Sequence, residues 1–218
     1  MEDVSQKIRK DILQSSYESG ACHIGSALSC VDILVTLFYK TLQKDDVFLF
    51  GKASGVATYY AILADKGHFP KNKLSYYLKN YPLASTEVPG IVHSFGSVGH
   101  GLSVACGMAL GDRSRNVYVL LSDGDCQEGS TYEAVLFAHH HKLNNLYVII
   151  DNNGLQACGA TQDILQLDNA FEFMKKSLKN IAVIDTVKGK GVDFMENDYT
   201  WHYKNLTESQ LKKALTQI

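Results

Sequence analysis

Three continuous apolar segments, separated by helical segments, constrain the fold of this chain more than any other feature. They are Asn116–Leu121, Asn145–Ile150 and Ile181–Ile184. Each is compact and apolar without a polar alternation, as expected for a strand buried on both faces. Continuous apolar strands alternating with helices are typical of a parallel sheet covered on both sides. The sequence therefore predicts a three-layer α/β/α fold with a mostly parallel sheet.

Helices are predicted on both sides of these strands from the spacing of apolar residues and from end signals. The expected helical ranges are about 3–18, 26–41, 54–66, 71–79, 100–111, 128–141 and 208–217. Gly20 and Gly67 follow two of them as stop signals, and Thr207 with Gln210 forms a capping box before the last. All three prolines lie between residues 70 and 89, which predicts an irregular stretch inside a single domain rather than a linker.

Composition narrows the class of protein. A chain of 218 residues favours one domain, residues 1–218, and a net charge of −2 argues against a nucleic-acid partner. No apolar run approaches the ~20 residues of a membrane span, so no membrane partner is expected. The charged N-terminus lacks a signal-peptide pattern, and the five cysteines are scattered. These features together predict a reducing, cytoplasmic location.

The chemistry is predicted at the ends of two neighbouring strands. Asp123 comes directly after the first apolar strand, and Asp151–Gly154 ends the second. Ligands of open parallel sheets bind at the carboxyl ends of the strands. A lone Asp-Gly or Asn-Asn-Gly is usually a turn, but the two together at successive strand ends are a much rarer pattern. Carboxylate and carboxamide oxygens suit Mg²⁺ or Ca²⁺ better than zinc.

These residues carry a resemblance to a known family. The segment 118–155 resembles the thiamine diphosphate signature, with Ser122 in place of its first glycine. The chain is similar to the N-terminal, diphosphate-binding section of transketolases, which some organisms make as a separate subunit. Four blocks carry this similarity, in order along the chain: Ser19–Ser26, Pro89–Ser103, Leu121–Asn152 and Thr186–His202.

The resemblance implies a metal and cofactor site made of thiamine diphosphate and Mg²⁺ (or Ca²⁺). Asp123 and Asn153 would bind the metal through side-chain oxygens, and Leu155 through its backbone carbonyl. Gly124 would let the backbone approach the diphosphate, which Lys188 would contact.

The resemblance also implies roles nearer the substrate. Gly96 and Val98 would contact the aminopyrimidine end of the cofactor. His23 and His202 would line the substrate channel and relay protons to substrate oxygens. Glu128 would belong to an acidic network that couples two active sites. The implied reaction transfers a two-carbon ketol unit from a ketose to an aldose, with sugars or sugar phosphates as substrates.

A partner is part of this expectation. The family's pyrimidine-binding domain carries a carboxylate that protonates the cofactor ring, and the residues after about 203 are too few to encode it. The resemblance therefore implies a heterotetramer with a C-terminal transketolase-like subunit.

The chain departs from the family pattern at three places. Ala53 stands at the expected position of one active-site histidine, and the stretch 81–86 replaces a second histidine motif. The connection between Leu167 and Ile181 is short, which indicates that one βα unit is missing. These departures leave two alternatives open: a thiamine-dependent transferase with a different donor or acceptor in specialised sugar or secondary metabolism, and a non-catalytic partner-binding subunit.

Three further residues near the site are expected to have no direct role. Asp125 is predicted to be a solvated loop carboxylate. Cys126 and Cys158 are predicted to be packing residues, because no base stands near either to activate a thiolate.

Overall fold

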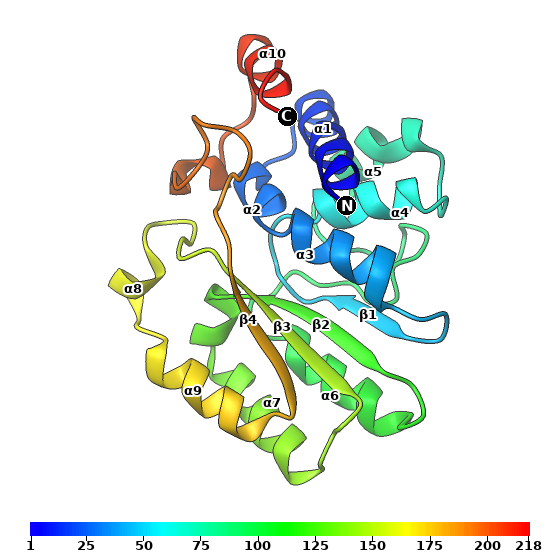
Figure 1. Cartoon of the computed structure of the whole chain (residues 1–218), viewed down its shortest axis with the longest axis vertical. Helices are drawn as coiled ribbons and strands as arrows, with labels where there is room; N and C mark the ends of the chain where they lie inside the picture. Colours follow the sequence, from blue (N-terminus) through cyan, green and yellow to red (C-terminus); the bar gives the residue numbers. More distant parts are fainter. The chain divides into compact units, whose positions relative to one another are not determined.

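A four-stranded parallel sheet organises the computed structural model, which describes residues 1–218. Its strands lie in chain order, β1 (Val47–Phe50), β2 (Val117–Ser122), β3 (Leu146–Asn152) and β4 (Asn180–Asp185), as Figure 1 shows. Every neighbouring pair is parallel, so all four carboxyl ends lie at one edge of the sheet. This confirms the predicted α/β fold with a mostly parallel sheet.

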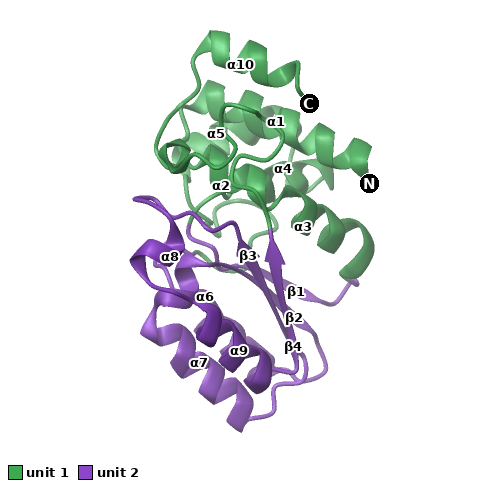
Figure 2. Cartoon of the chain, turned by 60° about the vertical axis from the view of Figure 1, so that its left-hand side comes forward, with its two compact units in different colours: residues 1–42, 54–94, 186–218 green, residues 43–53, 95–185 purple.

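The chain divides into two compact units, coloured separately in Figure 2. Unit 2 comprises residues 43–53 and 95–185 and contains the whole sheet. Helices α6 (Gly101–Gly111), α7 (Gly129–His140) and α9 (Asp168–Ser177) form a layer in which α6 packs on β1, β2 and β3, and α9 on β4. Two short helices, η3 (Gly124–Gln127) and α8 (Thr161–Ile164), follow β2 and β3.

Unit 1 comprises residues 1–42, 54–94 and 186–218 and is helical. Its longest helix is α1, which packs against α4, α5 and α10. The helices of this unit are α1 (Glu2–Ser19), α2 (Ile24–Ser29), α3 (Val31–Thr36), the π-helical turn η1 (Leu37–Thr41), α4 (Ala57–Asp65), η2 (Lys71–Lys73), α5 (Leu74–Asn80), η4 (Tyr199–His202) and α10 (Glu208–Leu215).

The end signals in the sequence act as expected. Gly20 ends α1 in a left-handed conformation, and its N–H bonds back into the last turn. The Thr207 side chain accepts from the N–H of Gln210, whose side chain accepts in return from the Thr207 N–H, so the capping box before α10 is confirmed. These local signals set the helix ends without help from distant parts of the chain.

One predicted helix is interrupted. The range 26–41 is not continuous, because it breaks at Cys30 between α2 and α3. The Cys30 thiol and the Ser29 hydroxyl hydrogen-bond to carbonyl groups one turn earlier, at Ser26 and Ala27. Side chains that bond to nearby backbone in this way compete with the regular helical pattern.

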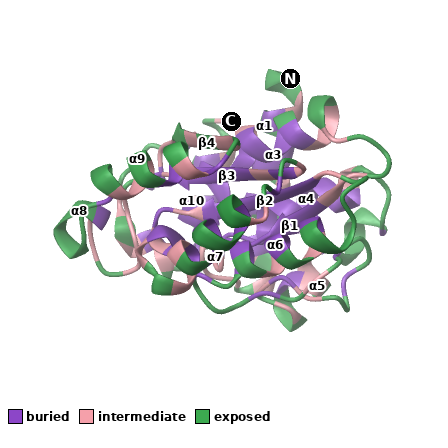
Figure 3. Cartoon of the chain, turned by 90° about the horizontal axis from the view of Figure 1, so that it is seen from below, coloured by how far each residue is buried: buried purple, intermediate pink, exposed green.

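The centre of the sheet forms the core of unit 2. β2 and β3 are almost entirely buried, as the purple strands of Figure 3 show, whereas β4 at the edge is partly exposed. β4 pairs directly with β3, and only α8 and α9 lie between them in the chain. This agrees with the prediction that the domain is truncated by one βα unit. No helix of the structure combines the length and the apolar character that crossing a bilayer requires.

Candidate functional site

Asp123 connects the ends of β2 and β3. It follows β2 directly and is 2% exposed. One carboxylate oxygen accepts the N–H of Gly124 (2.8 Å), and the other accepts the N–H of Gly154 (2.8 Å) and the hydroxyl of Thr161 (2.9 Å). Burial raises the pKa of Asp123, and the hydrogen bonds from Thr161 and Gly124 oppose that shift. The segment that follows β3 is therefore held against the end of β2, as the sequence predicts.

The segment after β3 is closed on itself. The side-chain oxygen of Asn153 accepts the N–H of Leu155 (3.1 Å), and Leu155 forms an antiparallel bridge with Ala160. The N–H of Thr161 donates to the carbonyl of Gly154 (2.9 Å). Asn153 is nearly buried, so its amide sits in a fixed turn beside Asp123 rather than in an open loop. The two predicted side-chain metal ligands are thus brought together.

The prediction that Asp125 is a solvated loop carboxylate is wrong, because its side chain is fully buried. It accepts the N–H of Gly99 (2.8 Å) and both the N–H and the hydroxyl of Ser122 (2.8 and 2.6 Å). Burial raises its pKa, against the effect of those hydrogen bonds. The backbone donors of Gly99 and Ser122 explain the burial, since they replace the water that the carboxylate loses. No local pattern in the sequence marks the bond from Gly99.

Through Asp125, the Gly96–Gly101 loop is tied to the end of β2. Gly99 has φ +82°, and a Cβ there would lie 2.4 Å from the Cβ of Glu128, so only glycine fits. Gly96 and Glu128 are exposed, and Val98 is 40% exposed. The predicted residues Gly96, Val98 and Glu128 therefore gather around one loop of unit 2, close to the β2 end.

A buried ion pair lies at the same edge of the sheet. Lys52, just beyond β1, pairs with Asp151 near the end of β3, and their side chains are 1% and 0% exposed. Lys52 is not among the site residues that the sequence predicts. The available signal is a lysine separated by one residue from the apolar run Val47–Phe50, at an edge where carboxylates are also predicted.

The remaining predicted residues form a second group, inside unit 1. The N–H of His23 donates to the carbonyl of His202 (2.8 Å), and the two rings meet edge to face with centroids 4.7 Å apart. Lys188 is fully buried, with its Nζ 3.4 Å from Nδ1 of His202. His23 has φ +68°, an uncommon conformation for a residue with a side chain, and such strain often marks a functional position.

The sequence of this chain is similar to those of known proteins. A family model described as 1-deoxy-D-xylulose-5-phosphate synthase matches residues 1–216. The chain is 32% identical over 260 residues to one of the subunits of the apulose-4-phosphate transketolase of Phocaeicola vulgatus, covering 98% of this chain and 92% of that protein. The chain belongs to the family of transketolase and 1-deoxy-D-xylulose-5-phosphate synthase N-terminal domains. We refer to it below as the transketolase family.

Two further transketolase proteins are similar to this chain over almost its whole length. The 6-deoxy-6-sulfo-D-fructose transketolase subunit SqwG of a Clostridium species is 30% identical over 260 residues, with 97% of this chain and 93% of that protein covered. The transketolase structure from Leishmania mexicana superposes with a TM-score of 0.84 at 20% identity, which shows a shared fold. It covers 98% of this chain, but this chain spans only 40% of that transketolase.

Within this transketolase-family chain, two cysteines near the site differ from each other. Cys126 is fully buried, and burial raises the pKa of its thiol well above the usual range, as a packing residue requires. Cys158 is exposed, so the prediction that it is a packing residue is wrong. It lies between Gln156 and Gly159, whose backbone groups bond to each other, in a turn that projects this side chain outward.

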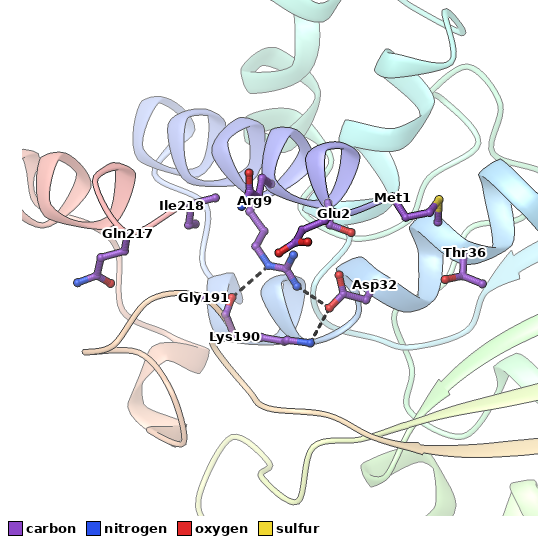
Figure 4. A pocket seen from close by; sticks show the side chains of 11 residues that line it. Met1, Glu2, Arg9, Asp32, Thr36, Lys190, Gly191, Gln217 and Ile218 are labelled. Atoms are coloured by element: carbon purple, nitrogen blue, oxygen red, sulfur yellow. Dashed lines mark hydrogen bonds and ion pairs between the residues drawn. The ribbon is translucent and has the colours of Figure 1, made fainter.

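A cavity of about 440 Å³ lies elsewhere in this transketolase-family chain, within unit 1, and Figure 4 shows its lining. Arg9 of α1 and Lys190 both bond to Asp32 of α3, at 2.8 and 2.7 Å. Burial raises the pKa of Asp32, but the two cations outweigh burial and hold that pKa below its usual range. The ion cluster joins two helices to the segment after β4, which indicates a structural role.

Proposed function

We propose that this chain is the thiamine diphosphate- and Mg²⁺-binding subunit of a split transketolase, which transfers a two-carbon ketol unit from a ketose to an aldose. Residues 1–218 would act as a single diphosphate-binding domain. The observation that carries the proposal is the bond from the Gly154 N–H to Asp123, because it places the Asn153 turn beside the carboxylate at the end of β2. Membership of the transketolase family supports it.

The donor set fits a hard divalent cation. Asp123 and Asn153 offer side-chain oxygens, and Leu155 offers a carbonyl, which are the ligand types of Mg²⁺ and Ca²⁺. The structure holds no group of three or more His, Cys, Asp or Glu side chains arranged for a metal. A site here depends on the amide, the carbonyl and the oxygens of a bound diphosphate. Asp123 uses three hydrogen bonds of the roughly four that a carboxylate accepts, so it retains capacity for a cation.

Residues of unit 2 would hold the cofactor around that cation. Gly124 and its backbone would face the diphosphate. Gly96 and Val98 lie on the loop held by Asp125, and their exposure suits contact with the aminopyrimidine. When bound, thiamine diphosphate supplies the nucleophilic carbon that accepts the two-carbon unit and passes it on.

The histidine pair of unit 1 would handle protons on substrate oxygens. A hydrogen bond from the Lys188 ammonium to Nδ1 of His202 places the proton of a neutral imidazole on Nε2. His202 would then donate from Nε2 to a substrate oxygen. The backbone bond from His23 to the His202 carbonyl keeps the two rings in contact. A lost donor at such a position costs about 10²-fold in rate or more.

A second polypeptide completes the proposed enzyme. The similar proteins from Phocaeicola and Clostridium are named as transketolase subunits, and this chain covers more than nine-tenths of each. We propose that a C-terminal transketolase-like subunit supplies the pyrimidine-binding domain, that the pair assembles as a cytoplasmic heterotetramer, and that the exposed Glu128 takes part in coupling its active sites.

A different donor or acceptor is the second candidate. The two similar proteins are named for apulose 4-phosphate and for 6-deoxy-6-sulfo-D-fructose, which are unlike each other. The truncated domain and the absent histidine motif at 81–86 favour a sugar that needs fewer contacts. A panel of phosphorylated and non-phosphorylated ketoses and 2-oxoacids separates this candidate from ordinary sugar-phosphate transfer.

The experiment that tests the proposal uses the full chain, co-expressed with a candidate C-terminal subunit. We expect Mg²⁺-dependent binding of thiamine diphosphate by calorimetry and ketol transfer in a coupled assay. Asp123→Ala and Asn153→Ala should each weaken cofactor binding by more than about 10-fold. Asn152→Ala is the matched control, because the Asn152 side chain bonds to Asp185 of β4 instead. Unchanged affinity in both site variants would show that the metal assignment is wrong.

A further inference from the structure

Lys52 occupies an unusual position for a lysine. It follows β1, and its N–H continues the sheet pattern by donating to the carbonyl of Leu120 in β2 (2.8 Å). Gly51 before it lies against the start of α6, where a Cβ on Gly101 would come within 2.6 Å of the Gly51 Cα. This contact between two backbones fixes the β1 end tightly. Lys52 is therefore held in the sheet and has little freedom to turn outward.

The side chain of Lys52 extends from the end of β1 to the end of β3. β2 lies between β1 and β3, yet the Lys52 ammonium reaches Asp151 on β3. Neighbouring strands are about 4.8 Å apart, so the lysine must extend past the end of β2, where Asp123 stands. Consistent with this path, the charge of Lys52 lowers the pKa of both Asp123 and Asp125, against the larger effect of burial.

Three buried carboxylates, Asp123, Asp125 and Asp151, and the buried Lys52 lie at the carboxyl end of the sheet. Lys52 forms a direct ion pair with Asp151. Asp123 and Asp125 accept hydrogen bonds from backbone N–H groups and hydroxyls. The ion pair therefore lies beside the place where Asp123 would bind a divalent cation.

We propose that Lys52 is a positioning residue of the metal site. By holding Asp151 through the buried ion pair, it fixes the end of β3, so that Asn153 and Leu155 present their oxygens beside Asp123. This inference rests on the proposed function, because it assumes that a divalent cation binds there. Lys52 itself does not touch the cation. Partners that orient metal ligands from outside typically change metal affinity by about 10- to 100-fold when removed.

The stability of the fold alone does not explain why the Lys52–Asp151 ion pair is buried, which favours a positioning role for it. Buried ion pairs can be replaced by uncharged residues of similar size with little loss of stability, or with a gain. Removing one partner, in contrast, leaves a lone buried charge and destabilises strongly. The double variant Lys52→Met/Asp151→Asn therefore separates the two effects, because it leaves no lone charge and keeps the summed charge of the cluster unchanged.

The test measures Mn²⁺ bound to the full chain, co-expressed with the candidate C-terminal subunit, at a fixed concentration of thiamine diphosphate, by electron paramagnetic resonance. Thermal midpoints of the metal-free proteins are recorded in parallel. We expect Lys52→Met to weaken Mn²⁺ binding by about 10-fold or more, and Lys52→Arg to recover most of that loss. The double variant should regain the thermal midpoint but keep the weak Mn²⁺ binding. If Lys52→Met does not fold, the double variant provides the comparison.

Arg9→Met is the matched control. Arg9 is 6% exposed and pairs with Asp32 in unit 1, so its loss should lower the thermal midpoint without changing Mn²⁺ affinity. A double variant that binds Mn²⁺ like the wild type would overturn the positioning role of Lys52 and leave the proposed function standing. A wild-type complex that binds no Mn²⁺ would overturn both.

Discussion

Asp125 offers the sharpest test of how the loop around Gly99 is held. Its carboxylate accepts the N–H of Gly99 and both donors of Ser122, and it is fully buried. Asp125→Ala removes all three acceptor contacts at once. The Ser122 hydroxyl can turn to another acceptor, but the two backbone N–H groups cannot, since their direction is fixed by the chain. The variant should therefore lose both stability and the order of the loop.

The size of the loss follows from the unpaired donors. A buried donor left without an acceptor costs about 1–3 kcal/mol. Two such N–H groups, less the relief from no longer burying a carboxylate, give a loss of about 3 kcal/mol. For a chain of this length, each kcal/mol corresponds to about 2–4 °C, so the thermal midpoint should fall by about 10 °C. Asp125→Asn keeps one acceptor oxygen and should lose about half as much.

The assay is urea unfolding followed by circular dichroism, with hydrogen exchange at the Gly99 amide. Asp112→Ala is the matched control, because Asp112 accepts the same two donors, N–H and hydroxyl, from Ser114 in an exposed turn. That variant should unfold near the wild-type midpoint. If Asp125→Ala lost less than about 1 kcal/mol while Gly99 kept its exchange protection, the carboxylate would not hold the loop.

Three further variants or treatments test separate features. Gly101→Ala would place a methyl group 2.6 Å from the Gly51 Cα, so we expect a loss of roughly 2–4 kcal/mol in urea unfolding; an unchanged midpoint would contradict that contact. Asp32→Asn removes a carboxyl group whose pKa lies below the usual range. Such a group stabilises the fold at pH values above the ordinary carboxyl pKa, near 4, and this stabilisation is lost as the pH falls through the pKa of the group in the folded protein. The free energy of unfolding of the wild type should thus be greater than that of this variant by at most about 1 kcal/mol at pH 7, after solvent screening. A difference that became larger below pH 4 would contradict the lowered pKa of Asp32. A thiol reagent should label the exposed Cys158 and spare the buried Cys126 in the native chain, as mass spectrometry would show; equal labelling would mean that Cys126 is accessible.

The sequence predicts those parts of the fold that depend on local or periodic signals. Continuous apolar runs predict β2 and β3 correctly, because a strand buried on both faces does not alternate. The run at β4 predicts the strand, but the prediction that it is buried on both faces is wrong, because β4 lies at the edge of the sheet and none of its residues is buried. The sequence also predicts that Asp123 and the Asn153 turn meet, since neighbouring parallel strands end at the same edge. The short strand β1 is also a continuous apolar run, Val47–Phe50, which sequence analysis does not single out.

The features that sequence analysis misses depend on distant contacts. Asp125 looks like a loop carboxylate because its Gly99 donor lies outside its own segment. Lys52 forms an ion pair with Asp151 across two strand spacings, and the sequence around neither residue predicts this partner. In each case a polar side chain becomes buried because another segment supplies its partner. Such partners are visible only after the topology is known.

The path of the chain through the two units has a consequence for biosynthesis. Unit 2 is complete once residues 43–53 and 95–185 exist, and its strands add one after another beside the previous strand. Unit 1 must wait, because α1 packs against α10, which is translated after the whole sheet. During translation the part of α1 that packs against α10 therefore stays uncovered while the sheet is already able to form. A ribosome that pauses before α10 would hold a nascent chain with a finished sheet and an incomplete helical unit, a state exposed to chaperones and proteases.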